Sequence, residues 1–168
     1  MRKITYIAGF LIGIISSLQA YAAWEVTTLE DVSNSSTRIA YVVNDEGYTV
    51  EIYKDSVGAV RSRFSLDEHS ERLADKHCPT FQIDSRIIDN RSLNDAPCIS
   101  NSDWSEYVLG YIENYQIKSE KLNALVNGIT FTFRFMLNNG EYRETRFSLE
   151  GSKRATLTVL GGDIDITP

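Results

Sequence analysis

Histidines and acids that cluster in a sequence are the first candidates for a metal site. The chain has only two histidines, His69 and His77. The acids around them are Asp67, Glu68, Glu71 and Asp75. Zinc ligands usually come in pairs at short spacings such as His-x-x-x-His, which a separation of eight residues does not match. Asp163 and Asp165 lack the Gly and Glu of a calcium-binding EF-hand loop, so we predict a polar C-terminal tail there and assign no metal ligand.

Paired carboxylates are the second candidate chemistry, because two acids at a suitable separation can hydrolyse a glycosidic bond. The chain has 23 acidic residues, so the sequence alone does not select one pair. Two examples are Asp84 with Asp89 and Asp103 with Glu106. Neither a Gly-x-Ser-x-Gly elbow nor a phosphate-binding glycine loop is present. We therefore assign no catalytic residue, no cofactor-binding residue and no cofactor.

The two cysteines, Cys78 and Cys98, are the third candidate. Their spacing is not that of a Cys-x-x-Cys redox motif, and His77 beside Cys78 does not by itself make a catalytic dyad. In an exported protein a disulfide is the favoured state. The bond would close a loop of about 21 residues and contribute ~3 kcal/mol.

Tyrosines and arginines raise the possibility of a binding face. The tyrosines concerned are Tyr41, Tyr48, Tyr53, Tyr107, Tyr111, Tyr115 and Tyr142. A tyrosine ring packs against a partner while its hydroxyl stays hydrated, but tyrosine also favours strands for structural reasons. Arg61, Arg63, Arg143 and Arg146 would form a local basic patch or simply face water on strands. The residue pattern fits a binding face or ordinary strand positions for the tyrosines, and a basic patch or water-facing strand positions for the arginines.

The N-terminus has the pattern of a cleavable signal peptide over residues 1–22. Arg2 and Lys3 precede an uncharged segment over 4–18, and small residues precede a cut after Ala22. The apolar segment of about 15 residues is shorter than the ~20 that a membrane-spanning helix needs. The sequence therefore predicts export to the periplasm or the external medium, with a mature form that does not span a membrane.

Length and charge narrow the function further. A chain of 168 residues suits a single domain. Its net charge is −6, and removal of the predicted signal peptide makes it more acidic. Nucleic-acid binding needs a basic stripe, so nucleic acid is not an expected partner.

Most of the sequence alternates apolar and polar residues, the pattern of a strand with one face in the core. The clearest strand spans 129–135, where every second residue is large and apolar. Other alternating faces are Ile39/Tyr41/Val43, Tyr48/Val50/Ile52, Val60/Phe64/Leu66 and Tyr107/Leu109/Tyr111. We predict one mainly β domain over residues 23–168, a small antiparallel β-sandwich. The phenylalanines of the 129–135 strand should pack against Leu109 and Phe147 or their neighbours.

One or two short helices complete the predicted domain. Residues 119–127 begin with Ser119, a good N-terminal cap, and end before Gly128. Residues 151–160 are a weaker helix candidate, since their β-branched residues equally suit a strand. Residues 85–103 are rich in Asn and Asp, which predicts a long excursion held by the disulfide.

Two segments, LNALVNGITFTF at 122–133 and FSLEGS at 147–152, resemble the C-terminal half of the invasion-associated locus B family of exported bacterial proteins. In that family a short helix ending in Lys-Gly or Asn-Gly leads into a strand, a hairpin and a Ser-Leu-x-Gly-Phe step. Cys78 shortly before Phe81 is a looser parallel. Ser152 stands where the family usually has an aromatic residue, and the family's fuller set of cysteines is not found. The resemblance implies a small exported β-sandwich without known catalysis, and it supplies no catalytic residues.

Together these features predict an exported, non-catalytic interaction or binding module of the bacterial envelope or secreted fraction. Its partner would be a protein or an envelope component, bound through a tyrosine-bearing sheet face or the 85–103 loop. The alternative is a small periplasmic hydrolase that uses a carboxylate pair.

Overall fold

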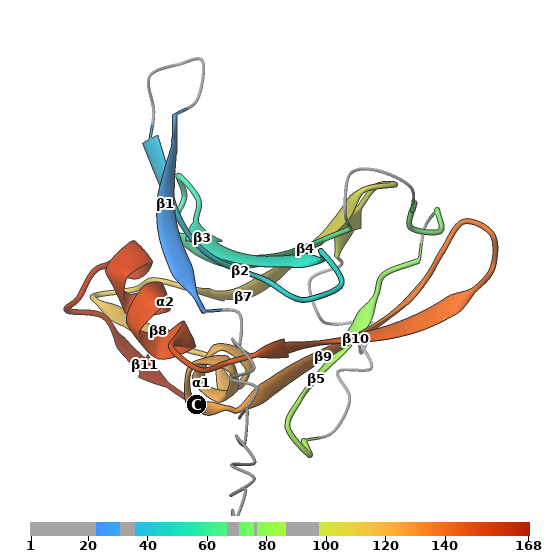
Figure 1. The fold of residues 1–168 in the computed structure, drawn as a ribbon. Coiled ribbons are helices and arrows are strands. Elements are labelled where there is room, and N and C mark those ends of the chain that lie inside the picture. Colours follow the sequence, from blue (N-terminus) through green and yellow to red (C-terminus); the bar gives the residue numbers. More distant parts are fainter. Residues whose placement is uncertain (1–22, 31–35, 67–70, 76, 87–97) are drawn as a thin grey trace, which may run out of the picture.

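A computed structural model describes residues 23–30, 36–66, 71–75, 77–86 and 98–168 of the chain. The protein is mainly β, with two short helices, as the alternation predicted (Figure 1). The strands are β1 (Glu25–Glu30), β2 (Ser36–Val43), β3 (Thr49–Lys54), β4 (Ala59–Ser65), β5 (Thr80–Ile83), β6 (Ile99–Ser100), β7 (Trp104–Tyr111), β8 (Gln116–Lys118), β9 (Thr130–Met136), β10 (Tyr142–Ser148) and β11 (Asp165–Thr167). The helices are α1 (Glu120–Asn127) and α2 (Ser152–Leu160).

The larger of the two main sheets has six antiparallel strands in the order β1-β2-β3-β4-β7-β6. The β2–β3 turn follows the predicted 44–47 segment, and Gly47 has the positive φ, 85°, that such a turn requires. The sheet is strongly bent, and the side turned away from β9 and β10 is concave (Figure 1). A register shift between Val60 and Arg61, where β4 meets β7, adds to this bend.

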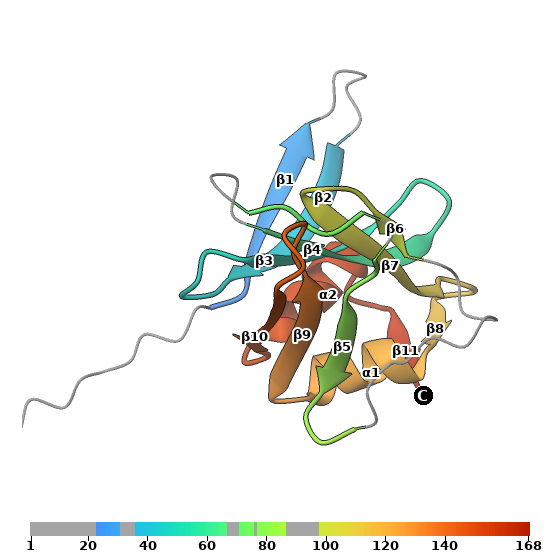
Figure 2. The same cartoon turned by 90° about the vertical axis from the view of Figure 1, so that its right-hand side faces the viewer.

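The smaller sheet has the order β10-β9-β5 and packs beneath the larger one (Figure 2). Helix α1 begins at the predicted cap, where the Ser119 side chain accepts a 3.1 Å hydrogen bond from the Leu122 backbone N–H. It ends at Gly128, whose backbone is extended, and a larger residue would not fit there because a Cβ would lie 2.8 Å from both the Ala124 carbonyl oxygen and the Ile83 side chain. Helix α2 settles the ambiguity at 151–160 in favour of a helix, which packs on β2 and β3.

The core lies between the two sheets and is rich in aromatic rings. Phe131, Phe133 and Phe135 are all buried, as predicted. Phe133 stacks on Phe64 of β4 with ring centroids 4.6 Å apart, and its edge meets Phe147 at 6.1 Å. The predicted packing of the 129–135 strand is therefore confirmed, except that Ile129 precedes β9 and is 77% exposed.

Two expectations about local structure were wrong. On β2 the core face is formed by Ala40 and Val42, whereas Tyr41 and Val43 lie on the other face with Ile39. A small residue suits this position because α2 packs closely against β2. The second error concerns the C-terminus, where Asp165–Thr167 is not a polar tail but strand β11, paired in parallel with β8.

Candidate binding site on the outer face of the larger sheet

The face of the six-stranded sheet that is turned away from the core, here called the outer face, carries a cluster of charged side chains. The register places Glu51, Arg63 and Glu106 opposite one another on β3, β4 and β7. Arg63 Nη2 lies 2.9 Å from Glu106 Oε2, and its Nη1 lies 3.8 Å from Glu51 Oε2. Arg61 joins the same Glu106, at 2.9 Å, to Asp55, at 2.8 Å. Two arginines thus link the two glutamates and Asp55 into one cluster.

Glu106 is the fully paired member of this cluster. Its side chain is only 7% exposed, and it accepts hydrogen bonds from Tyr53, Arg61 and Arg63. Burial alone would raise the pKa of the Glu106 carboxyl, but these hydrogen bonds and the two guanidinium charges outweigh it and lower the pKa. Glu106 is therefore a carboxylate that is held ionised.

Glu51 has the opposite character. Its Oε2 atom is buried and has no hydrogen-bond partner among the described residues. Burial raises the pKa of Glu51, the Arg63 charge opposes this, and the Glu106 charge adds to it. Arg63 thus lies between Glu106, which is hydrogen-bonded and ionised, and Glu51, which makes only a 3.8 Å ion pair and holds its proton more tightly.

Two aromatic rings hold the arginine between these glutamates. The Arg63 guanidinium carbon lies 4.8 Å from the Trp104 ring centroid and 5.3 Å from that of Tyr53. Cation–π contacts of this kind stabilise a cation whose charge is already partly desolvated. Two ion pairs and two aromatic rings therefore hold the Arg63 guanidinium in place on the sheet.

A cavity of about 430 Å³ opens beside this cluster. Its lining residues are Thr49, Glu51, Ser65, Leu66, Arg72, Asp103 and Trp104. Arg72 and Asp103, each about half exposed, form an ion pair with each other. The Thr49, Ser65 and Trp104 side chains make no hydrogen bond to a described residue. Polar groups that converge on a cavity without protein partners are the usual mark of a ligand site.

A larger and more open hollow, about 1240 Å³, lies between the β2–β3 turn and β10. Its polar groups are largely paired within the protein. Asn44 Nδ2 donates to Thr145 Oγ1 at 2.6 Å and to the Arg146 carbonyl at 3.2 Å. Arg146 also forms a 2.8 Å ion pair with Glu144. The smaller cavity is therefore the better candidate site.

The acid pairs predicted from the sequence are not arranged as catalytic pairs. Asp103 is bound to Arg72 and Glu106 to two arginines, and the pKa of Glu106 is lowered where a general acid needs it raised. Asp84 Oδ1 accepts hydrogen bonds from the Ile129 and Thr130 backbone N–H groups, at 3.0 and 2.8 Å, and so positions the start of β9. Its suggested partner, Asp89, lies outside the described residues.

Sequence reasoning missed Glu51, the most informative acid of the site. The alternation along β3 does place it on the face opposite Val50 and Ile52, together with Tyr53. The pattern does not reveal that Arg63 binds Glu106 and that Glu51 Oε2 receives no hydrogen bond.

The tyrosines and arginines do not form single patches. Tyr41 and Tyr53 lie on the outer face, whereas Tyr48 and Tyr107 are buried in the core. The others, Tyr111, Tyr115 and Tyr142, are exposed elsewhere. Arg61 and Arg63 are engaged in the outer-face cluster, while Arg143 and Arg146 lie on β10 of the other sheet.

The remaining candidates give no site. His77 is exposed, and its Nδ1 lies 3.1 Å from the Asp75 carbonyl, while His69, Asp67 and Glu68 lie outside the described residues. Within the described ranges, no group of three or more His, Cys, Asp or Glu side chains is placed to hold a metal ion. No helix in that part of the chain is long and apolar enough to cross a membrane.

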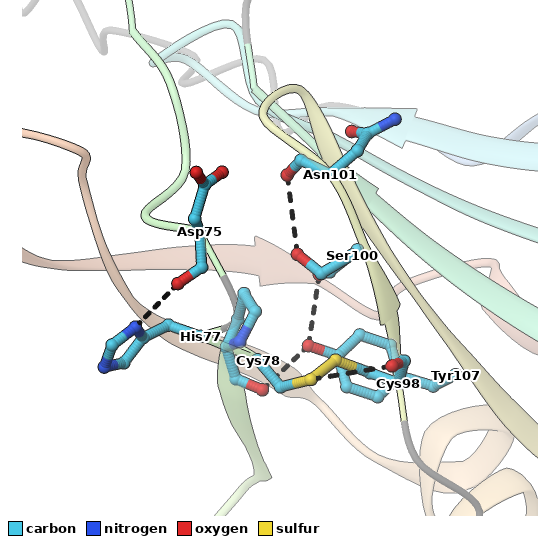
Figure 3. Close-up of a disulfide and its surroundings, with 9 residues drawn as sticks. Asp75, His77, Cys78, Cys98, Ser100, Asn101 and Tyr107 are labelled. Atoms are coloured by element: carbon cyan, nitrogen blue, oxygen red, sulfur yellow. Dashed lines mark hydrogen bonds between the residues drawn. A yellow bond between two sulfur atoms is a disulfide. The ribbon is translucent and has the colours of Figure 1, made fainter.

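The predicted disulfide is present and joins Cys78 to Cys98 with a Cα–Cα distance of 6.1 Å (Figure 3). Next to it the buried Tyr107 hydroxyl donates a 2.7 Å hydrogen bond to the Pro79 carbonyl. The bond therefore ties the start of β5 to the segment that enters β6. Most of the predicted 85–103 excursion, residues 87–97, lies outside the described residues, as does the predicted signal peptide.

Comparison with protein-family models, curated proteins and solved structures finds no match to this chain.

Proposed function

We propose that the chain is an exported, non-catalytic binding module of the bacterial envelope or secreted fraction, which holds its ligand on the outer face of the six-stranded sheet. The observation that carries this proposal is the cavity beside the outer-face cluster, in which the buried Oε2 atom of Glu51 has no hydrogen-bond partner among the described residues. The pattern of the N-terminal 22 residues and the Cys78–Cys98 disulfide support export. The resemblance to the invasion-associated locus B family agrees with a non-catalytic role.

A crosslinking experiment in intact cells tests this proposal. The photoreactive residue p-benzoylphenylalanine is introduced at Ile99, which is 54% exposed and lies opposite Glu106 on the outer face. The matched control carries it at Tyr142, which is 75% exposed on β10. We expect the exported protein to crosslink to an envelope component from Ile99 but not from Tyr142. Equal labelling from both positions, or none from either, would contradict a binding site on the outer face.

A hydrolase is the second candidate, because one observation favours it. Glu51, whose pKa is raised by burial, lines the same cavity as Asp103, and an acid with a raised pKa beside a second carboxyl is the arrangement of a glycosidase. The test is release of reducing ends from envelope glycan by the wild-type protein, Glu51→Gln and Asp103→Asn. Turnover that both variants abolish would establish the enzyme and overturn the non-catalytic module.

A further inference from the structure

We propose that the cavity beside Glu51 is a subsite for an uncharged saccharide ring, so that the ligand of the binding module is a neutral glycan. This inference rests on the proposed function, because it names the ligand class of the same site. Three properties of the cavity support a neutral glycan: its polar groups without hydrogen-bond partners, its charge and its aromatic wall.

The unpaired groups supply both donors and acceptors. The Trp104 indole N–H can only donate, the Glu51 carboxylate can only accept, and the Thr49 hydroxyl does either. None of these three side chains is hydrogen-bonded to another described residue. A ligand that satisfies them needs several groups that both donate and accept within a small volume. Vicinal hydroxyl groups on a sugar ring have this property, whereas phosphate or carboxylate groups only accept when ionised.

The charges around the cavity disfavour ionic ligands. Arg72 is neutralised by Asp103, and Arg63 by Glu106. An anionic ligand would meet the Glu51 carboxyl, whose ion-pair partner Arg63 is held more closely by Glu106. A cationic ligand would meet Arg63, which already lies 3.8 Å from Glu51. An uncharged ligand avoids both costs.

The walls of the cavity suit the apolar face of a sugar ring. Trp104 and Leu66 both line it, and the Arg63 guanidinium fixes the indole from one side. A pyranose ring has a face of C–H groups that packs on such a wall while its hydroxyls reach the polar groups. The volume, about 430 Å³, lies at the small end of ligand pockets, which fits a short glycan segment.

The two tryptophans of the chain make the test self-controlled. Trp104 lines the cavity, whereas Trp24 is buried in the core on the other side of the sheet. The indole N–H resonances are followed by NMR while N,N′,N″-triacetylchitotriose, cellotriose or maltotriose is added to about 10 mM, enough to saturate a site with a Kd near 1 mM. We expect at least one of these neutral trisaccharides to shift the Trp104 resonance saturably and to leave Trp24 in place.

Variants and charged probes complete the experiment. Glu51→Ala should weaken binding by about tenfold or more, because a charge-assisted acceptor is lost. Glu25→Ala, on the same face but outside the cavity lining, should leave binding unchanged. Tighter binding of trigalacturonate or of a glucosamine trimer would overturn the neutral-glycan proposal. So would the absence of any Trp104 shift with all five probes, whereas specific crosslinking from Ile99 would still support the binding module.

Discussion

The Trp24 indole N–H donates a 2.8 Å hydrogen bond to the backbone carbonyl of Ser148. Trp24 is the second residue after the predicted cleavage site, and Ser148 ends β10, an edge strand of the smaller sheet. The Asn44 side chain likewise donates a hydrogen bond to the Arg146 carbonyl, two residues earlier on the same strand. Side chains that cap an exposed edge protect it from pairing with another chain. The segment just before β1 therefore covers part of the free edge of β10.

The first prediction concerns this contact. Trp24→Phe keeps a buried ring but leaves the Ser148 carbonyl without its donor, so we expect a loss of about 1–2 kcal/mol in the free energy of unfolding. Urea denaturation of the mature protein measures it. Tyr142→Phe on the exposed side of β10 is the control and should change stability little. Equal effects of the two substitutions would show that the indole hydrogen bond contributes nothing.

The second prediction concerns the aromatic core. Phe133 is fully buried and contacts Phe64, Phe131 and Phe147. Truncation leaves a cavity among rings that cannot collapse, so Phe133→Ala should cost about 3–5 kcal/mol. Ile129→Ala, just before the same strand and 77% exposed, serves as the control. A loss below that of the control would contradict the packing of β9 against β4.

The sequence predicted elements that depend on neighbouring residues better than elements that depend on residues far apart in the chain. Alternation of large apolar residues identified β9, because a phenylalanine face has no other place than the core. On β2 the alternation of large apolar residues indicated the wrong face, because the small Ala40 faces the core and Tyr41 faces outward. The β8–β11 pair joins two segments of three residues that are far apart in the chain, and neither is long enough to show a period.

The candidate site was harder to predict than the fold for the same reason. Arg61, Arg63 and Glu106 were each noticed, yet their charges are paired only through the register of three strands. Glu51 matters because of what it lacks, a hydrogen-bond donor for a buried oxygen. No local pattern in the sequence records an unpaired group.

The third prediction concerns the disulfide. The intact mass of the exported protein should rise by two hydrogen atoms on reduction, because Cys78 and Cys98 are joined. Reduction should lower the free energy of unfolding by about 3 kcal/mol, with proteolysis starting between the two cysteines. The Cys78→Ser/Cys98→Ser double variant should match the reduced protein. Labelling of both thiols in native, unreduced protein would contradict the bond.

The fourth prediction compares two ion-paired glutamates. Glu106 is nearly buried and accepts hydrogen bonds from three side chains. Glu106→Gln would place an amide NH₂ group, itself a donor, next to these donors. We expect a loss of about 2–4 kcal/mol in unfolding free energy. Glu144→Gln is the matched control, because its 2.8 Å ion pairs with Arg146 and Arg134 lie at the solvent-accessible surface and should be worth at most about 1 kcal/mol each. Similar losses for both variants would show that the outer-face cluster is not desolvated.

The fifth prediction is a dependence of stability on pH that Glu51 and Glu106 drive in opposite directions. Burial raises the pKa of Glu51 in the folded protein, so its contribution to stability is present below its unfolded pKa and is lost as the pH rises through the folded value. Hydrogen bonds and guanidinium charges lower the pKa of Glu106 against the effect of burial, so its contribution is present above the unfolded pKa and is lost as the pH falls through the folded value.

Glu51→Gln separates the two effects, since it removes only the first. At about pH 7 the buried site of Glu51 disfavours the charged carboxylate that the unfolded chain carries, and the variant has no such cost, so the variant should be the more stable. At about pH 4 the wild-type Glu51 is protonated, and the two proteins should converge. Urea unfolding of both across this range measures the difference. A variant that is less stable than wild type at neutral pH would show that the Glu51–Arg63 attraction outweighs the burial of the Glu51 charge.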